Sequence, residues 1–279
     1  MKKHILILVS LLFSIFIFPS DADVLTSIKP YYFITSSIAG SQITVKNILP
    51  EYSSPHTYSP KPSDIRMMSN AKLIILNGLH LEENLINKMK NDRRAVIIGD
   101  SLYEESDINP HIWLSIDNLK SAALIVKNAL VKIDSANALY YAANYELFLD
   151  SLMKTDSIIR MERAVHDSIE IITFHNSFHY FLEQYDITAA GTIEEVPGRE
   201  PSPGHLVKLI ERARLKHIEA VYSEPQLNSK SADIIASELG VNVYEMDPLG
   251  NIDEIQSISQ LLMYNWSMIE KGITDDRSE

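Results

Sequence analysis

The segment from residue 136 to residue 165 contains neither proline nor glycine and keeps a helical pattern throughout. Asp134 and Ser135, directly before it, are residue types that cap helix N-termini. At 1.5 Å per residue such a helix would be about 45 Å long, which is enough to run the height of two domains. We assign residues 134–166 to this helix. We predict that it is one stiff connector, which limits how far the two domains that it joins can swing apart.

Short apolar segments rich in β-branched residues alternate with helical patterns on both sides of this connector. The predicted strands are residues 24–28, 43–49, 73–76, 95–98, 169–173, 220–223 and 241–245. The predicted helices beside them are residues 30–39, 63–70, 81–90, 177–185, 202–215, 229–239 and 253–270. The pattern predicts an α/β fold of two lobes, each a mostly parallel central sheet flanked by helices. The N-terminal lobe covers residues 23–133 and the C-terminal lobe residues 167–279.

The first residues have the pattern of a secretory signal peptide. Two lysines follow Met1, residues 4–18 are almost all apolar, and small residues stand at Ser20 and Ala22. The apolar run is about 15 residues long, whereas a membrane-spanning helix needs roughly 20. We therefore predict a signal peptide at residues 1–22, cleavage after Ala22, a mature protein in the periplasm and no stable membrane insertion. An uncleaved membrane anchor is the alternative.

Cysteine is absent from the sequence. Disulfides therefore cannot stabilise the fold, a metal site cannot use thiolates, and no cysteine is available to carry a lipid. The net charge is −12, and no cluster of Lys and Arg occurs. Such a surface would repel a phosphate backbone, which argues against nucleic-acid binding. It raises the local concentration of cations but selects none of them.

Four residues, far apart in the sequence, are candidate metal ligands. His56 and His111 each follow a proline in a turn-rich segment, and His175 and Asp247 come just past predicted strands, where open α/β sheets bind ligands. Neutral imidazoles with one carboxylate suit zinc. No local zinc motif exists, and a single histidine after a strand or proline is also a common cap or core residue. Residue types alone therefore do not decide whether these four residues form one metal site.

The segments around these residues are more specific. In chain order they read SIKP (27–30), SPHTYSPKPSD (54–64), AKLIILNG (71–78), NPHIWLS (109–115), TFHNSF (173–178), EPSP (200–203), SEPQ (223–226) and DPLG (247–250). This series resembles the metal-binding receptors of bacterial zinc and manganese importers, the periplasmic zinc-binding proteins of ABC transporters. The resemblance runs in order over nearly the whole mature chain.

The resemblance implies a transport function and a ligand set. It implies a monomeric receptor, not an enzyme, that holds Zn2+ in the cleft between two α/β lobes and delivers it to an ABC transporter membrane permease. The ligand positions fall on His56, His111 and His175, with Asp247 as the fourth ligand. Manganese-type relatives carry a carboxylate where His175 stands, so zinc is favoured and Mn2+ is the alternative cargo.

Two positions depart from the pattern of these receptors. Residues 99–109 are short and contain acidic residues but no histidine, whereas many zinc-type relatives carry a histidine-rich loop there. A second, metal-collecting loop is therefore not expected. Some zinc-type members place a carboxylate just before the first histidine, where this chain has Pro55. That leaves Asp247 or a water as the fourth partner.

A zinc-dependent hydrolase is the rival class, because three histidines with an open position also describe a catalytic site. A carboxylate from Asp247 would close that position, and the GxSxG and HExxH motifs are absent. His179, four residues after His175, is predicted to pack or to support a ligand residue rather than bind metal. For Glu224 two roles remain open, which are a hydrogen bond to a loop or the orientation of a ligand imidazole.

Overall fold

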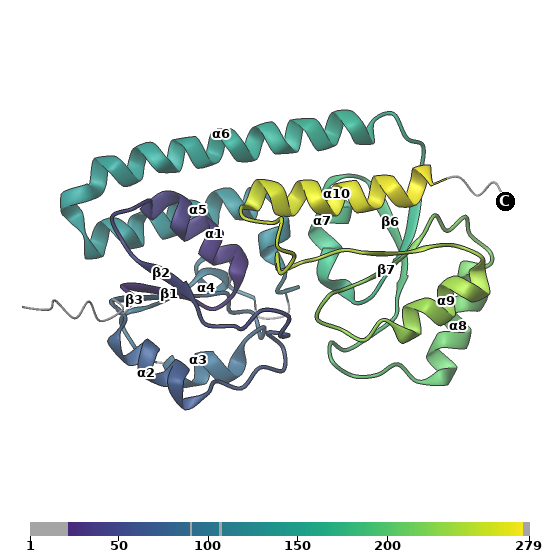
Figure 1. Ribbon diagram of the computed structural model, residues 1–279, viewed down its shortest axis with the longest axis horizontal. Helices are drawn as coiled ribbons and strands as arrows, with labels where there is room; N and C mark the ends of the chain where they lie inside the picture. The colour runs from purple at the N-terminus through teal and green to yellow at the C-terminus, as the bar shows by residue number, and fades with distance from the viewer. Residues whose placement is uncertain (1–21, 90, 106–107, 276–279) are drawn as a thin grey trace, which may run out of the picture.

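Two sheets of four parallel strands form the framework of the protein (Figure 1). The computed structural model describes residues 22–89, 91–105 and 108–275. The strand orders are β2-β1-β3-β4 and β6-β5-β7-β8. The α/β fold class with two mostly parallel sheets is therefore confirmed. The predicted signal peptide lies outside the described residues except for Ala22.

The first sheet has short strands with a helix after most of them. Its strands are β1 (Val24–Thr26), β2 (Val45–Asn47), β3 (Leu73–Leu76) and β4 (Ala95–Ile97). Its helices are α1 (Lys29–Ala39), α2 (Pro62–Asn70), α3 (Glu83–Met89) and α4 (Ile98–Leu102). Every residue of β3 is buried because helices cover both faces of the sheet, as parallel sheets require.

The second sheet repeats this arrangement. Its strands are β5 (Ile169–Thr173), β6 (Ile187–Thr192), β7 (Val221–Ser223) and β8 (Val243–Glu245). Its helical segments are the 3-10 turn η3 (Asn176–Phe178), α7 (His179–Gln184), α8 (Pro203–Ala213) and α9 (Lys230–Leu239). The sequence pattern predicts no strand at β6, whose middle is Ala189-Ala190-Gly191. The side chain of Leu209 in α8 packs closely against Gly191, 2.5 Å from the position a Cβ would take.

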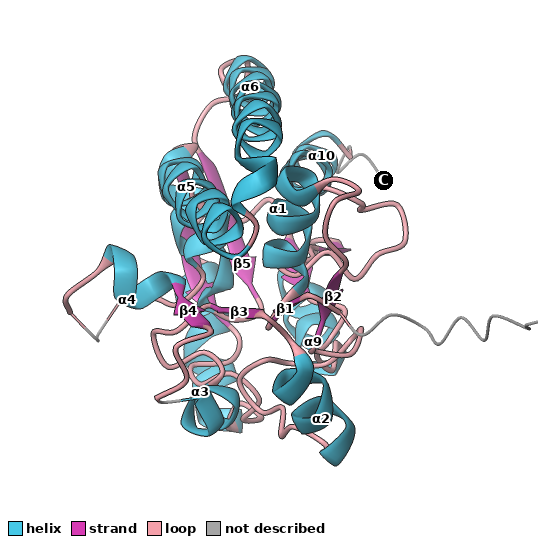
Figure 2. Cartoon of the chain, turned by 90° about the vertical axis from the view of Figure 1, so that its left-hand side faces the viewer, coloured by secondary structure: helices cyan, strands magenta, loops and turns pink. Residues whose placement is uncertain are grey.

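Long helices lie across the top of both sheets (Figures 1 and 2). They are α5 (Ile116–Ile133), α6 (Ala138–Arg163) and α10 (Ile258–Thr274), with the 3-10 turns η1 (Ile112–Leu114) and η2 (Ser135–Asn137) before the first two. The long connector is present as α6, although η2 delays its start to Ala138, four residues after the predicted start, and it ends at Arg163, three residues before the predicted end. Helix α10 begins later than predicted because Ser257 Oγ caps it, accepting the N–H of Gln260.

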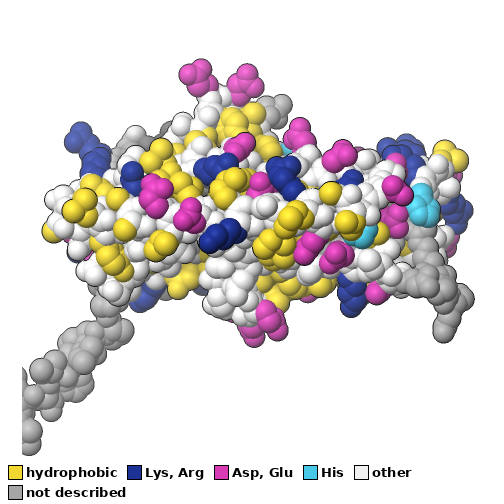
Figure 3. All heavy atoms as spheres, turned by 90° about the horizontal axis from the view of Figure 1, so that it is seen from above, with side chains coloured by type: hydrophobic (Ala, Val, Ile, Leu, Met, Phe, Trp, Pro, Cys, Tyr) yellow, Lys and Arg dark blue, Asp and Glu magenta, His cyan; other side chains and the backbone are white. Residues whose placement is uncertain are grey.

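The largest apolar cluster joins the two halves, because α1, α5, α6 and α10 pack together with residues of both sheets. Figure 3 looks down on these helices and shows apolar side chains interspersed with charges of both signs. Leu139, Leu147 and Met161 of α6 are among the exposed apolar residues. Of the helices within the described residues, none combines the length and apolarity that a bilayer span needs.

Candidate metal centre

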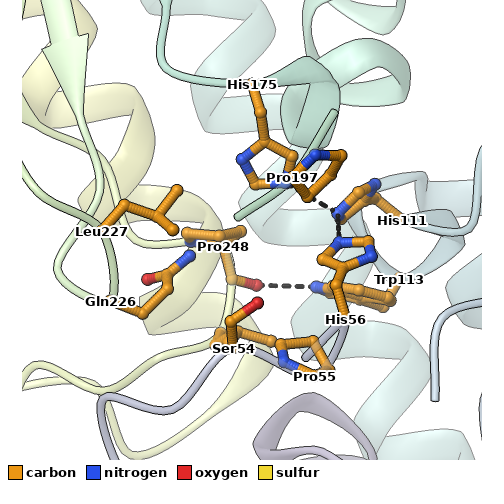
Figure 4. A pocket seen from close by; sticks show the side chains of 11 residues that line it. Ser54, Pro55, His56, His111, Trp113, His175, Pro197, Gln226, Leu227 and Pro248 are labelled. Carbon is orange, nitrogen blue, oxygen red and sulfur yellow. Dashed lines mark hydrogen bonds between the residues drawn. The ribbon is translucent and has the colours of Figure 1, made fainter. Parts of the chain in front are cut away.

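Three loops meet between the sheets, and each brings one histidine to the same point (Figure 4). His56 lies between β2 and α2, His111 directly before η1, and His175 between β5 and η3. The Nε2 atom of His111 lies 3.3 Å from that of His56 and 3.2 Å from that of His175. One ligand nitrogen of each ring lies within 4.8 Å of the other two. The structure thus brings together three of the four predicted ligands.

The spacing of these nitrogens is that of ligands around one small cation. Zinc binds imidazole nitrogen at about 2.0–2.1 Å in tetrahedral geometry, which places neighbouring ligand atoms about 3.3 Å apart. The two Nε2 separations of 3.3 Å and 3.2 Å match this value. Two of the three pairs of rings therefore have the nitrogen spacing of a tetrahedral zinc site.

Partners of the second ring nitrogen determine which nitrogen carries the proton. Asn109 Oδ1 accepts hydrogen bonds from the backbone N–H and from Nδ1 of His111, at 3.0 Å and 2.9 Å. His175 Nδ1 lies 2.7 Å from Glu224 Oε1, with the oxygen to one side of the N–H direction. Asn109 therefore holds the proton of His111 on Nδ1, which leaves the Nε2 lone pair of that ring free. The Nε2 atoms of His111 and His175 lie 3.2 Å apart, an arrangement that a bound cation would stabilise.

Burial keeps two of these imidazoles neutral. It lowers the pKa of His56 to about 3, with the neighbouring His175 as the second cause. It also holds the pKa of His111 well below its usual range, with His175 and His56 adding to the effect. Neutral imidazole is the form that binds metal. No proton therefore has to leave His56 or His111 before an ion binds at neutral pH.

These lowered pKa values make the stability of the metal-free protein depend on pH. Between about 6.5, the ordinary histidine pKa, and the folded-state values, the unfolded chain binds protons that the folded chain does not. The free energy of unfolding is therefore expected to fall as the pH drops below about 6.5. The slope approaches about 1.4 kcal/mol per pH unit for each such histidine.

Urea unfolding of the metal-free protein between about pH 7 and about pH 5 measures this slope. In a His56→Asn variant, the slope of the unfolding free energy against pH should be smaller by the contribution of one histidine, about 1.4 kcal/mol per pH unit. An identical slope in the variant and the parent protein would contradict the lowered pKa of His56.

The His111 loop is fixed by buried contacts that the sequence reasoning did not identify. Asn77, directly after β3, donates from its side-chain amide to the carbonyl of Pro110 at 2.9 Å and accepts from the Tyr31 hydroxyl at 2.7 Å. Trp113 Nε1 donates to the carbonyl of Pro248, in the other lobe, at 2.6 Å. The available signal for Asn77 was a polar residue following the wholly apolar strand β3. These contacts hold His111 at the junction of the two lobes.

Asp247, the predicted fourth ligand, is not part of the histidine group. Its side chain is fully buried after β8. Its carboxylate accepts backbone N–H bonds: Oδ1 from Leu249 and Gly250 at 2.9 Å each, and Oδ2 from Ile252 at 3.0 Å and from Asn251. Gly250 has a φ of +76°, which this turn requires. The carboxylate therefore faces its own backbone turn rather than the imidazoles.

Only a small space lies beside the histidines. The cavity measures about 10 Å³, which is roughly the room of one water molecule or one metal ion. Both lobes line it, with Ser54 and Pro55 from one side and Pro197, Gln226 and Pro248 from the other (Figure 4). An organic substrate would not fit in this cavity.

Comparison with known proteins agrees with this geometry. Residues 24–272 match the family described as "Zinc-uptake complex component A periplasmic". The manganese-binding lipoprotein MntA of Halalkalibacterium halodurans is 28% identical over 225 residues, which cover 75% of this chain and 73% of that protein. The high-affinity zinc uptake system protein ZnuA of Bacillus subtilis is 26% identical over 253 residues, which cover 83% of this chain and 79% of that protein.

A crystal structure of ZnuA has a TM-score of 0.80 to this chain and 28% sequence identity, and the match covers 91% of this chain and 100% of that one. The family match extends over nearly all the described residues and includes the three histidine loops. The chain therefore belongs to the family of periplasmic A components of zinc-uptake complexes.

Proposed function

We propose that this protein captures one zinc ion outside the cytoplasmic membrane and delivers it to the membrane permease of an ABC-type importer. The convergence of the Nε2 atoms of His56, His111 and His175 carries the proposal. The names of the relatives, which include a zinc uptake protein and a manganese-binding protein, support a divalent transition metal as the cargo.

The ligand chemistry favours zinc over manganese. Three neutral imidazole nitrogens suit zinc, whereas manganese prefers carboxylate, carbonyl and water oxygens. The group of converging residues contains no carboxylate among the described residues. We propose three protein ligands and a water at the fourth position, with Asp247 serving the turn after β8.

A transport role also fits the cavity better than hydrolysis does. An open fourth position could in principle hold an activated water. However, a space of about 10 Å³ leaves no room for an organic substrate beside the ion. Because the ligands come from both lobes, movement of one lobe against the other would break the ligand set. Docking on the permease is proposed to release the ion in this way.

Metal titration tests the proposal. Metal-free protein, titrated in competition with a chromophoric chelator, is expected to bind about one zinc ion per chain. Manganese is expected to bind at least about a hundredfold more weakly, because it has the lowest affinity in the first-row divalent series and prefers oxygen ligands. The absence of zinc binding would refute the proposal. Manganese binding as tight as zinc would refute the choice of ion.

The proposed location is the periplasm, with the protein acting as a monomer. Several relatives are named as lipoproteins, for example MntA. This sequence has no cysteine through which such a lipid could be attached. A receptor that is free in solution would meet its permease by diffusion.

A further inference from the structure

Glu224 is a buried carboxylate directly behind one of the histidines. It follows β7 and is 2% exposed. Its Oε1 lies 2.7 Å from Nδ1 of His175 and accepts a hydrogen bond from Ser177 Oγ at 2.9 Å. Its Oε2 accepts from Gln226 Nε2 at 2.7 Å. Every contact of this carboxylate thus leads to the His175 loop or to a residue lining the cavity.

The charge of Glu224 has no matching cation in the described part of the chain. Within residues 22–89, 91–105 and 108–275, His175 is the only ionisable group at ion-pair distance, and no Lys or Arg reaches the carboxylate. A buried carboxylate held by neutral donors alone is costly, because burial removes its hydration. A divalent ion on Nε2 of His175 would supply the missing positive charge through the ring. The burial of Glu224 is thus explained by an ion that binds on the far side of the imidazole.

The second ring nitrogen of His111 has a different kind of partner. His111 Nδ1 donates to the neutral amide oxygen of Asn109, whereas His175 Nδ1 faces an anion. A neutral acceptor fixes the ring and its tautomer. An anionic acceptor does this and also makes the imidazole a stronger electron donor to the metal. The second ring nitrogens of the two histidines therefore face partners of different charge.

We propose that Glu224 is a positioning residue for the metal site, which fixes the Nδ1–H form of His175, aims its Nε2 at the ion and supplies the negative charge that balances it. The inference rests on the proposed function. The competing possibility is that Glu224 only ties the Ser177 and Gln226 segments together.

An E224Q variant separates these roles, because glutamine has the same shape but no charge. We expect its zinc affinity to fall about 10- to 100-fold, with about one ion still bound per chain. We expect the metal-free variant to unfold at the same or a higher urea concentration, because a buried charge without a cation has been removed. A merely structural role would give the opposite pair of results, with lower stability and unchanged affinity.

E195Q is the matched control. Glu195 carries the same charge, but it is exposed and pairs with His205. Its zinc affinity should equal that of the parent protein. Equal affinity in E224Q and E195Q, in a parent that binds zinc, would overturn the positioning role alone. A parent that binds no zinc would overturn the proposed function itself.

A measurement on the unsubstituted protein covers the case in which E224Q does not fold. In zinc-loaded protein with 15N-labelled histidine, NMR should show His175 protonated at Nδ1 and bound to metal through Nε2. Metal bound through Nδ1, or an Nδ1 without a proton, would overturn the proposal.

Discussion

Replacing His111 with alanine is expected to lower zinc affinity by about a hundred- to a thousandfold. Zinc binding to sites of four protein ligands is worth about 10–16 kcal/mol, so each ligand contributes about 3–4 kcal/mol. His111 is the central ligand, since its Nε2 lies within 3.3 Å of the Nε2 atoms of both other rings. Competition titration with a chelator measures the loss, and circular dichroism checks that the variant is folded.

His179→Ala is the matched control for this experiment. His179 is the histidine nearest to His175 in the sequence, but it is partly exposed, lies 3.8 Å from Glu183 and does not belong to the converging group. Its removal should leave zinc affinity unchanged. Equal losses in the His111 and His179 variants would mean that the loss does not arise from a ligand. Unchanged affinity in the His111 variant would refute the three-histidine site.

The position of the histidines could be predicted from the sequence because parallel sheets constrain where loops meet. His175 follows β5, and the carboxyl ends of parallel strands lie at one edge of their sheet. Strands β3 and β5 have the predicted bounds, since both lie in the centre of a sheet, where β3 is wholly apolar and buried and β5 buries its three isoleucines. The edge strand β6 is rich in small residues and shows no such pattern. Sequence periodicity thus identified central strands better than edge strands.

The direction of a side chain could not be predicted in the same way. Asp247 lies just after β8, as expected, but the turn that follows takes up its carboxylate. That turn depends on the left-handed backbone of Gly250, and a DPLG segment does not reveal which donors the aspartate will reach. Asn109 is the opposite case, a residue that supports the metal site although the sequence did not single it out. It stands two residues before His111, and only the folded loop shows that its amide oxygen accepts from the imidazole.

Replacing Asp247 with alanine is expected to destabilise the metal-free protein by about 3–5 kcal/mol. Four backbone N–H groups, three of them buried, would lose their acceptor, at about 1–3 kcal/mol for each buried group, and the total is smaller than the sum because the turn can relax and admit water. The same turn presents the Pro248 carbonyl to Trp113, so the contact between the lobes should loosen as well. Urea unfolding measures the loss.

Zinc binding by the same variant decides whether Asp247 is also a ligand. If the carboxylate serves only the turn, the folded variant should still bind about one ion per chain, with affinity within about tenfold of the parent protein. If it binds the metal, affinity should fall by about a hundredfold or more, as for a lost histidine. Asp253→Ala is the control, because Asp253 is an exposed carboxylate on the same loop. A large loss of affinity in the Asp247 variant with little loss of stability would show that the carboxylate leaves its turn to reach the ion.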